Sequence, residues 1–147
     1  MNSTLLIVVL FVVGALSALQ PSVNARLAER VGGVLPSATV SFAVGALALL
    51  AVLAAGGRTA TLKGVTGAAW WELSGGLLGA AYVSATILAF PRVGTAAGMA
   101  AVIAAQLTAG LFLDRMGAFG FRQIALDWRR VVGVALLLLG AALVQRR

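Results

Sequence analysis

Apolar residues fill five long stretches of the chain, and short polar connections separate them. Each stretch runs for about 14 to 21 residues and shows no strict alternation of apolar and polar positions. A hydrocarbon core of about 30 Å is crossed by roughly 20 helical residues, so each stretch with its interfacial flanks predicts a transmembrane helix. A transmembrane barrel would instead need strands of about ten alternating residues. The predicted helices span residues 4–28, 37–55, 70–90, 94–113 and 129–145.

The first predicted helix carries a polar face close to its end. Ser17, Gln20, Pro21 and Asn24 are spaced at i, i+3, i+4 and i+7, so they share one face if the helix continues through Pro21. Proline removes a backbone donor and kinks or ends a helix. Because lipid satisfies neither these side chains nor a broken backbone, we expect this face to point towards protein or a cavity. The alternative is that residues 20–24 simply form the exit of the helix at the membrane surface.

Small residues mark contact faces in the later helices. Gly75 and Gly79 form a GxxxG pair in the third predicted helix, and Tyr82 continues the same face. Gly94 and Gly98 begin a similar face of small residues in the fourth predicted helix. In lipid, helices associate through close van der Waals contact, which small residues allow. We therefore expect these four glycines to pack against another helix, either in the same chain or in a second copy.

Gln106 is a polar residue well inside the fourth predicted helix. Its amide needs a partner in hydrocarbon, so it should face a neighbouring helix, water or a ligand. An interhelical hydrogen bond contributes only about 0.6 kcal/mol on average in membranes. The pattern leaves open whether Gln106 makes such a bond or contacts a transported solute. The candidate pathway residues are thus Ser17, Gln20, Asn24, Tyr82 and Gln106.

The composition excludes most catalytic chemistry. The chain is 61% hydrophobic and 10% charged, whereas soluble domains are about 25% charged. It contains no Cys and no His, which removes thiolates, the commonest metal ligands and the usual general base. The four acids lie at or near the ends of apolar stretches: Glu29, Glu72, Asp114 and Asp127. We therefore expect no enzymatic activity, no metal site and no cofactor.

The basic residues fall almost evenly on the two sides of a membrane that five helices would cross. Six lie on the side of the N-terminus: Arg58, Lys63, Arg115, Arg122, Arg129 and Arg130. Five lie on the other: Arg26, Arg30, Arg92, Arg146 and Arg147. Loops rich in Lys and Arg are normally retained in the cytoplasm and so set the orientation of the chain. A difference of one basic residue between the two sides gives only a weak preference for either orientation. The split predicts a chain that inserts both ways and pairs with an inverted copy, or one that a partner orients.

The net charge of +7 is spread along the connections. The basic residues stand singly or in pairs between apolar runs, which indicates contact with lipid headgroups. No nucleic-acid partner is expected.

The ordered set of polar, aromatic and small residues resembles the YdcZ-type inner-membrane proteins over nearly the whole chain. The fragments are individually weak, but their order and spacing are specific. They are Gly14, Gln20, Asn24, Leu27, Ser41, Phe42, Gly45, Trp70, Trp71, Gly75, Gly76, Gly79, Ala80, Tyr82, Pro91, Arg92, Val93, Gly94, Gln106, Asp114, Gly117, Ala118, Phe119, Gly120, Arg130, Gly133 and Gly140.

The resemblance places the chain in the drug/metabolite transporter superfamily. It implies a bacterial inner-membrane transporter of about five helices that works as an antiparallel pair with ten helices. Two such copies form an inverted repeat, from which alternating access can be built. The related small multidrug resistance proteins exchange protons for cations through a Glu in their first helix. Residues 5–19 contain no acid here, so that coupling mechanism and those substrates are not carried over.

The prediction is therefore an all-α integral membrane protein with one transmembrane domain over residues 1–147. We expect an antiparallel homodimer in the lipid bilayer that moves an unknown small solute. The alternative is a non-transporting subunit that assembles with a partner membrane protein. Polar faces on several helices favour transport, because a partner-only role would allow those faces to be apolar and small.

Overall fold

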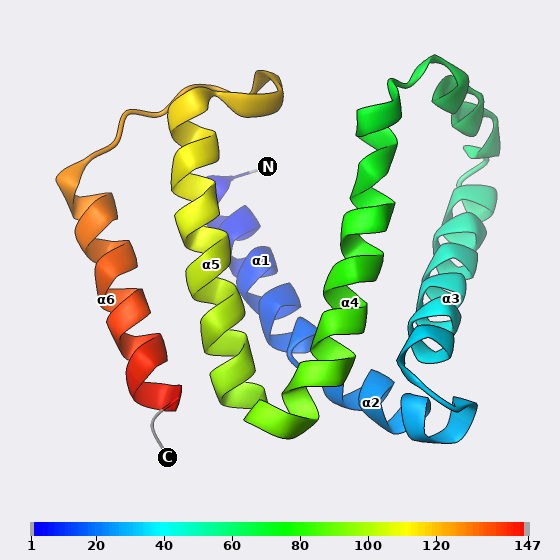
Figure 1. The fold of residues 1–147 in the computed structure, drawn as a ribbon. Helices are drawn as coiled ribbons and strands as arrows, with labels where there is room; N and C mark the ends of the chain where they lie inside the picture. Colours follow the sequence, from blue (N-terminus) through cyan, green and yellow to red (C-terminus); the bar gives the residue numbers. More distant parts are fainter. Residues whose placement is uncertain (1, 146–147) are drawn as a thin grey trace. The chain divides into compact units, whose positions relative to one another are not determined.

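The computed structural model describes residues 2–145, and its regular elements in that range are all helices (Figure 1). Six are α-helices and three are short 3₁₀ helices. In chain order they are α1 (Ser3–Ser17), α2 (Gln20–Val31), α3 (Val34–Ala55), η1 (Thr59–Gly67), η2 (Trp70–Leu73), α4 (Ser74–Val93), α5 (Thr95–Met116), η3 (Ala118–Gly120) and α6 (Trp128–Gln145).

Five helical segments are long and apolar enough to cross a membrane. They are Ser3–Val31, Val34–Ala55, Trp70–Val93, Thr95–Met116 and Trp128–Gln145. Two of these segments include a proline that the predicted helices 37–55 and 70–90 left just outside their bounds. Pro36 lies in the first turn of α3, where the backbone N–H has no partner within the helix, so α3 begins before it. Pro91 lies in the last turn of α4, which continues to Val93.

The first span is broken between α1 and α2. Pro21 has no N–H to donate to the carbonyl of Ser17 four residues earlier, and its ring crowds that carbonyl. Helix α1 therefore ends at Ser17, while Ala18 and Leu19 keep right-handed helical dihedral angles. The chain resumes as α2 at Gln20. The kink expected at Pro21 is thus a short interruption that keeps both segments helical.

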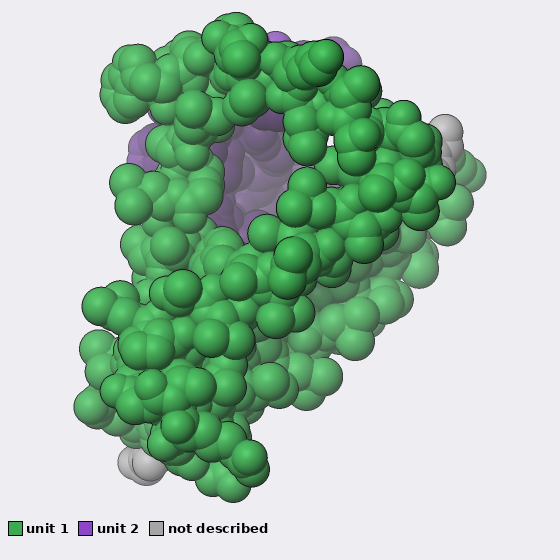
Figure 2. Space-filling model, turned by 90° about the vertical axis from the view of Figure 1, so that its right-hand side faces the viewer, with its two compact units in different colours: residues 1–92 green, residues 93–147 purple. Residues whose placement is uncertain are grey.

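The backbone contacts divide the chain into two compact units, residues 1–92 (unit 1) and residues 93–147 (unit 2) (Figure 2). We describe each unit by itself. One transmembrane domain over residues 1–147 stays a prediction.

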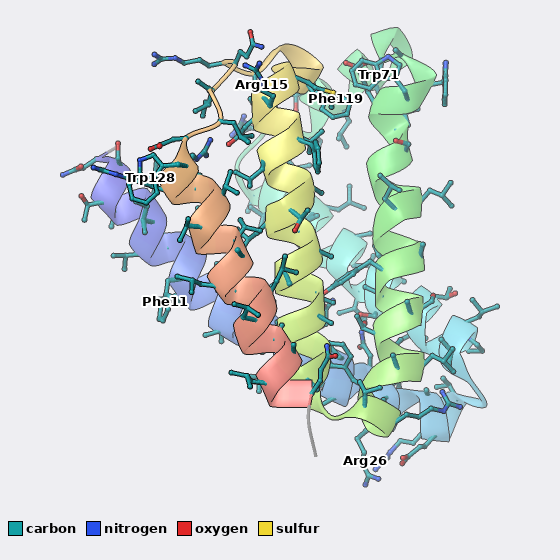
Figure 3. All side chains as sticks on the ribbon, turned by 60° about the vertical axis from the view of Figure 1, so that its left-hand side comes forward. Phe11, Arg26, Trp71, Arg115, Phe119 and Trp128 are labelled. Carbon is teal, nitrogen blue, oxygen red and sulfur yellow. The ribbon has the colours of Figure 1, made fainter. Side chains whose placement is uncertain are left out.

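Unit 1 is held together where α2, α3 and α4 meet. Its small buried core joins Ala38 of α3 to Val83 and Ile87 of α4, with Ala28 of α2 and Val34 of α3 packed against it. Helix α1 adds nothing to this core, because none of the residues Ser3–Ser17 is buried. The side chain of Phe11 in α1 points away from the helix, and the residue is 78% exposed (Figure 3). A segment this apolar and this exposed is suited to lipid or to a second protein chain.

Unit 2 is a hairpin of α5 and α6. The connection between them folds back on the end of α5 and satisfies carbonyls that a helix terminus leaves open. The N–H of Ile124 donates to the carbonyl of Asp114 at 2.9 Å, and the side-chain amide of Gln123 donates to the carbonyl of Arg115 at 2.7 Å. Gly117 makes the turn with φ of 60°, and a Cβ there would lie 3.2 Å from the carbonyl oxygen of Phe121. Glycine is required at this position by both conformation and space.

Candidate functional site

A groove in unit 1 brings α2 and α3 together around polar groups. It has a volume of about 330 Å³ and is lined by Gln20, Ser41, Phe42, Gly45, Ala46 and Leu49. Gln20 stands at the start of α2, directly after the helix break. Gly45 lies one turn beyond Ser41 on α3, and the absence of a side chain there keeps the groove open. The groove therefore has an apolar wall with an amide and a hydroxyl on it.

A buried polar contact lies one helical turn away from the groove. Asn24 follows Gln20 by four residues and Ser37 precedes Ser41 by four, so each pair shares one face of its helix. The Ser37 hydroxyl donates to the carbonyl of Asn24 at 2.7 Å. Ser37 is 0% exposed and Asn24 is 5% exposed. This bond joins α2 to α3 beneath the groove.

The side-chain amide of Asn24 is left without a partner. Its Nδ2 atom is buried and donates to no acceptor among residues 2–145. A buried donor without an acceptor costs about 1–3 kcal/mol. Groups of this kind in native proteins call for an explanation such as an absent ligand, water or ion. Asn24 is the member of the predicted pathway that the structure places deepest in unit 1.

The other predicted pathway residues have different surroundings. Ser17 is exposed, and its hydroxyl donates to the carbonyl of Gly14 in its own helix at 2.8 Å. Tyr82 on α4 is 38% exposed and does not line the groove of α2 and α3. Gln106 belongs to unit 2, where it lines a second groove between α5 and α6. The structure thus brings Gln20 and Asn24 together on one helix face, and the pathway roles of all five residues stay predictions.

The glycines predicted to pack also differ from one another. A Cβ on Gly79 would lie 3.2 Å from the ring of Phe42 on α3, so this glycine leaves room on α4 for the Phe42 side chain. Gly75 has open space around it, with nothing within 4 Å of such a Cβ. Gly94 precedes α5 with φ of 89°, a conformation that suits glycine. Gly98 lies in the first turns of α5 and is buried.

Two features of these grooves escaped the sequence analysis. The bond between Ser37 and Asn24 crosses two helices, and only knowledge that α2 and α3 pack face to face would have paired them. The other is an ion pair between Asp114 and Arg130, whose Oδ2 and Nη2 atoms lie 2.6 Å apart. Their positions at the end of one helix and the start of the next were a usable signal, because consecutive helices are usually neighbours in space.

The unit 1 groove offers hydrogen bonds without charge. Its polar groups are the amide of Gln20 and the hydroxyl of Ser41, with the amide of Asn24 below them. Among the described residues, no three acidic side chains gather as a metal site would require. The arrangement is suited to holding a small polar solute by neutral donors and acceptors against an apolar wall.

Comparison with known proteins gives one family. The sequence model of the family described as "Putative inner membrane exporter, YdcZ" matches residues 5–143. The protein of Escherichia coli (strain K12) named Inner membrane protein YdcZ is 31% identical over 148 residues, which cover 100% of this chain and 99% of that relative. No solved structure matches the chain.

Proposed function

Because the chain belongs to the YdcZ family of bacterial inner-membrane proteins, we propose that it is a small-solute transporter that works by alternating access in an antiparallel homodimer. The family description and the five candidate membrane-spanning helices support a role in export. The pathway in this proposal runs along the face of Gln20 and Asn24 and includes Gln106. Ser17 and Tyr82 extend it where the second copy approaches.

The observation that carries the proposal is the unpaired amide of Asn24. This Nδ2 atom is buried in the single chain, next to a groove that opens beside Gln20 and Ser41. A protein that used α2 and α3 only for packing would gain stability from an apolar residue at position 24, because nothing repays the desolvation of the amide. A solute or a chain of waters that passes through the groove gives this donor an acceptor for part of the cycle.

The broken first span supplies the movement that such a cycle needs. Transporters of this kind often place their sites at discontinuous helices, where freed backbone groups line a cavity. Here the interruption at Ala18 and Leu19 comes directly before Gln20. A change of angle at this joint would move the pathway face of α2 relative to α1 while the bond from Ser37 keeps α2 attached to α3.

An antiparallel pair explains how five helices per chain make a complete transporter. An odd number of spans puts the two termini on opposite sides of the membrane, so an inverted copy gives an inverted repeat. The nearly even charge split, six against five, favours insertion in both orientations. The apolar and unburied α1 offers a surface for this contact.

The test measures solute flux in proteoliposomes. A thermal-stability screen of the purified protein against metabolites and cations, repeated across pH, supplies the solute. We expect Asn24→Leu and Gln106→Leu to keep dimer assembly and to reduce flux at least tenfold, because each removes a hydrogen-bonding group from the pathway. The control is Val23→Leu, which changes an exposed apolar residue next to Asn24 on α2. Unchanged flux in both amide variants would reject these positions as pathway residues.

A further inference from the structure

Unit 2 holds a groove with a charge pair at one end and an amide at the other. It has a volume of about 330 Å³ and lies between α5, with Gln106, Gly110 and Asp114, and α6, with Arg130, Gly133 and Leu137. Gln106, Gly110 and Asp114 follow each other at intervals of four, so they form one stripe along α5. Eight helical residues span about 12 Å, which separates the amide from the carboxylate along the groove. A volume of this size suits a small ligand.

Arg130 carries more donors than the protein satisfies. Its Nη2 atom pairs with Oδ2 of Asp114 at 2.6 Å, and the two side chains are 36% and 38% exposed. Its Nη1 atom is buried and has no acceptor within residues 2–145. A guanidinium presents five N–H groups in a planar fork that matches a carboxylate or a phosphate. The Nη1 group of Arg130 therefore lacks a hydrogen-bond acceptor, which a ligand in this groove could supply.

The charges around the groove favour an anion as well. The described part of unit 2, residues 93–145, contains two acids, Asp114 and Asp127, against four arginines, Arg115, Arg122, Arg129 and Arg130. Asp127 accepts the N–H of Arg129 at 3.3 Å and so caps the start of α6. Arg129 lies over the ring of Trp128, 5.7 Å from its centre. Asp114 is thus the acid that faces Arg130 in the groove, and the local excess of positive charge attracts oxyanions.

We propose that this groove binds a small organic oxyanion, with the oxygens on Arg130 in competition with Asp114 and the apolar body along Leu107, Leu111 and Leu137. The far end of the ligand points towards Gln106, whose amide can make one hydrogen bond to a polar group placed there. Asp114 occupies the guanidinium when the groove is empty and keeps the arginine from being left unpaired, which is costly in a membrane protein. The site shares Gln106 with the proposed pathway, but its test does not rest on transport, because binding is measurable without flux.

Two sources can supply such an oxyanion. One is a free carboxylate that enters the groove from water. The other is the headgroup of an anionic lipid, because an arginine near the end of a transmembrane helix also meets lipid phosphates. The experiment therefore varies the solute and the lipid separately.

The test uses the full chain in nanodiscs of phosphatidylcholine, titrated calorimetrically with hexanoate and with hexanamide as the neutral match. We expect hexanoate to bind and hexanamide to bind at least about tenfold more weakly, because a charge-assisted hydrogen bond to the guanidinium is stronger than a neutral one. Arg130→Gln should abolish the difference between the two. Asp114→Asn should raise the hexanoate affinity about tenfold, because it removes the competing carboxylate.

The two variants move binding in opposite directions, which a purely structural ion pair cannot do. Breaking a structural pair from either side would lower stability and leave hexanoate affinity absent or unchanged. Thermal unfolding and gel filtration of each variant show that it is folded. If Arg130→Gln is not folded, Arg130→Lys replaces it, with an expected loss of affinity because the point charge cannot form the bidentate contact.

The lipid source has its own readout. If hexanoate fails to bind in phosphatidylcholine, nanodiscs containing phosphatidylglycerol should raise the unfolding temperature of the wild type and not that of Arg130→Gln, which supports the site with a lipid as ligand. Absence of both effects, or equal effects in wild type and Arg130→Gln, overturns the proposal.

Discussion

At the residue scale, a buried side-chain hydrogen bond links α2 to α3 in unit 1. Ser37 is 0% exposed and donates to the carbonyl of Asn24, so Ser37→Ala removes the donor and leaves a small void. We expect the free energy of unfolding to fall by about 0.6–1.7 kcal/mol, the range measured for such bonds in membranes. Unfolding in mixed micelles with increasing sodium dodecyl sulfate measures the change.

The control for this prediction lies two residues along the same helix. The Thr39 hydroxyl donates to the carbonyl of Leu35 within α3 and is exposed, so Thr39→Ala should change stability by a few tenths of a kcal/mol at most. Equal losses in both variants would show that the effect at Ser37 does not come from its contact with α2, since alanine itself favours the helix.

The two grooves differ most clearly in the residues that they leave unpaired. In unit 1 the donor is a neutral amide, that of Asn24, and in unit 2 it is the guanidinium of Arg130. An amide accepts as well as donates and tolerates many solutes, whereas a guanidinium donates only and selects oxyanions. We therefore expect the two grooves to bind different chemistry, although their volumes are similar.

At the scale of elements, the broken first span follows from one proline. Pro21→Ala restores an N–H that can donate to the carbonyl of Ser17, so α1 and α2 should join into one continuous helix. We expect amide hydrogen exchange at residues 18–22 to slow by at least tenfold, because a proline inside a helix costs about 3 kcal/mol. If the joint takes part in the transport cycle, flux should fall in the same variant.

Pro36→Ala is the matched control for that change. Pro36 lies in the first turn of α3, where no backbone bond is missing, so exchange in α3 should stay as it is. Fast exchange at residues 18–22 in Pro21→Ala would show that the break has another cause, such as the packing of α2 on α3.

The sequence predicted the helical spans well because hydropathy acts over many residues at once. A span is recognised by the mean hydropathy of roughly 20 residues, and a single proline changes that mean little. The sequence predicts a connection over residues 59–67, whereas these residues form the 3₁₀ helix η1. Such short helices depend on local hydrogen bonds with no periodic pattern to reveal them. The break between α1 and α2 was foreseen as a kink at Pro21 because that constraint is carried by one residue type.

At the scale of the whole molecule, the grooves were less predictable than the helices. Polarity within an apolar run identified Gln20, Asn24 and Gln106, because such residues need partners whatever the fold. Which helix supplies the partner depends on how the helices pack, and the sequence carries no direct signal of that. Ser37 and Arg130 were therefore missed as partners of Asn24 and Asp114.

The orientation of the chain is the last property that the sequence predicts and that an experiment can settle. If the chain inserts both ways, a C-terminal fusion to alkaline phosphatase should be active outside the membrane, and the same fusion to green fluorescent protein should fluoresce inside.

The basic residues should set the share of chains in each orientation, because six of them oppose five and positive segments are retained in the cytoplasm. Two arginines added beside Thr4 should then raise the share of chains with an external C-terminus. Two added beside Gln145 should raise the internal share, and the same number placed inside the apolar run of α1 would test insertion and not orientation. If the C-terminus were labelled from one side only, and neither pair of added arginines changed this, an inverted homodimer of this chain alone would be rejected. A partner protein of fixed orientation would then have to supply the other five helices.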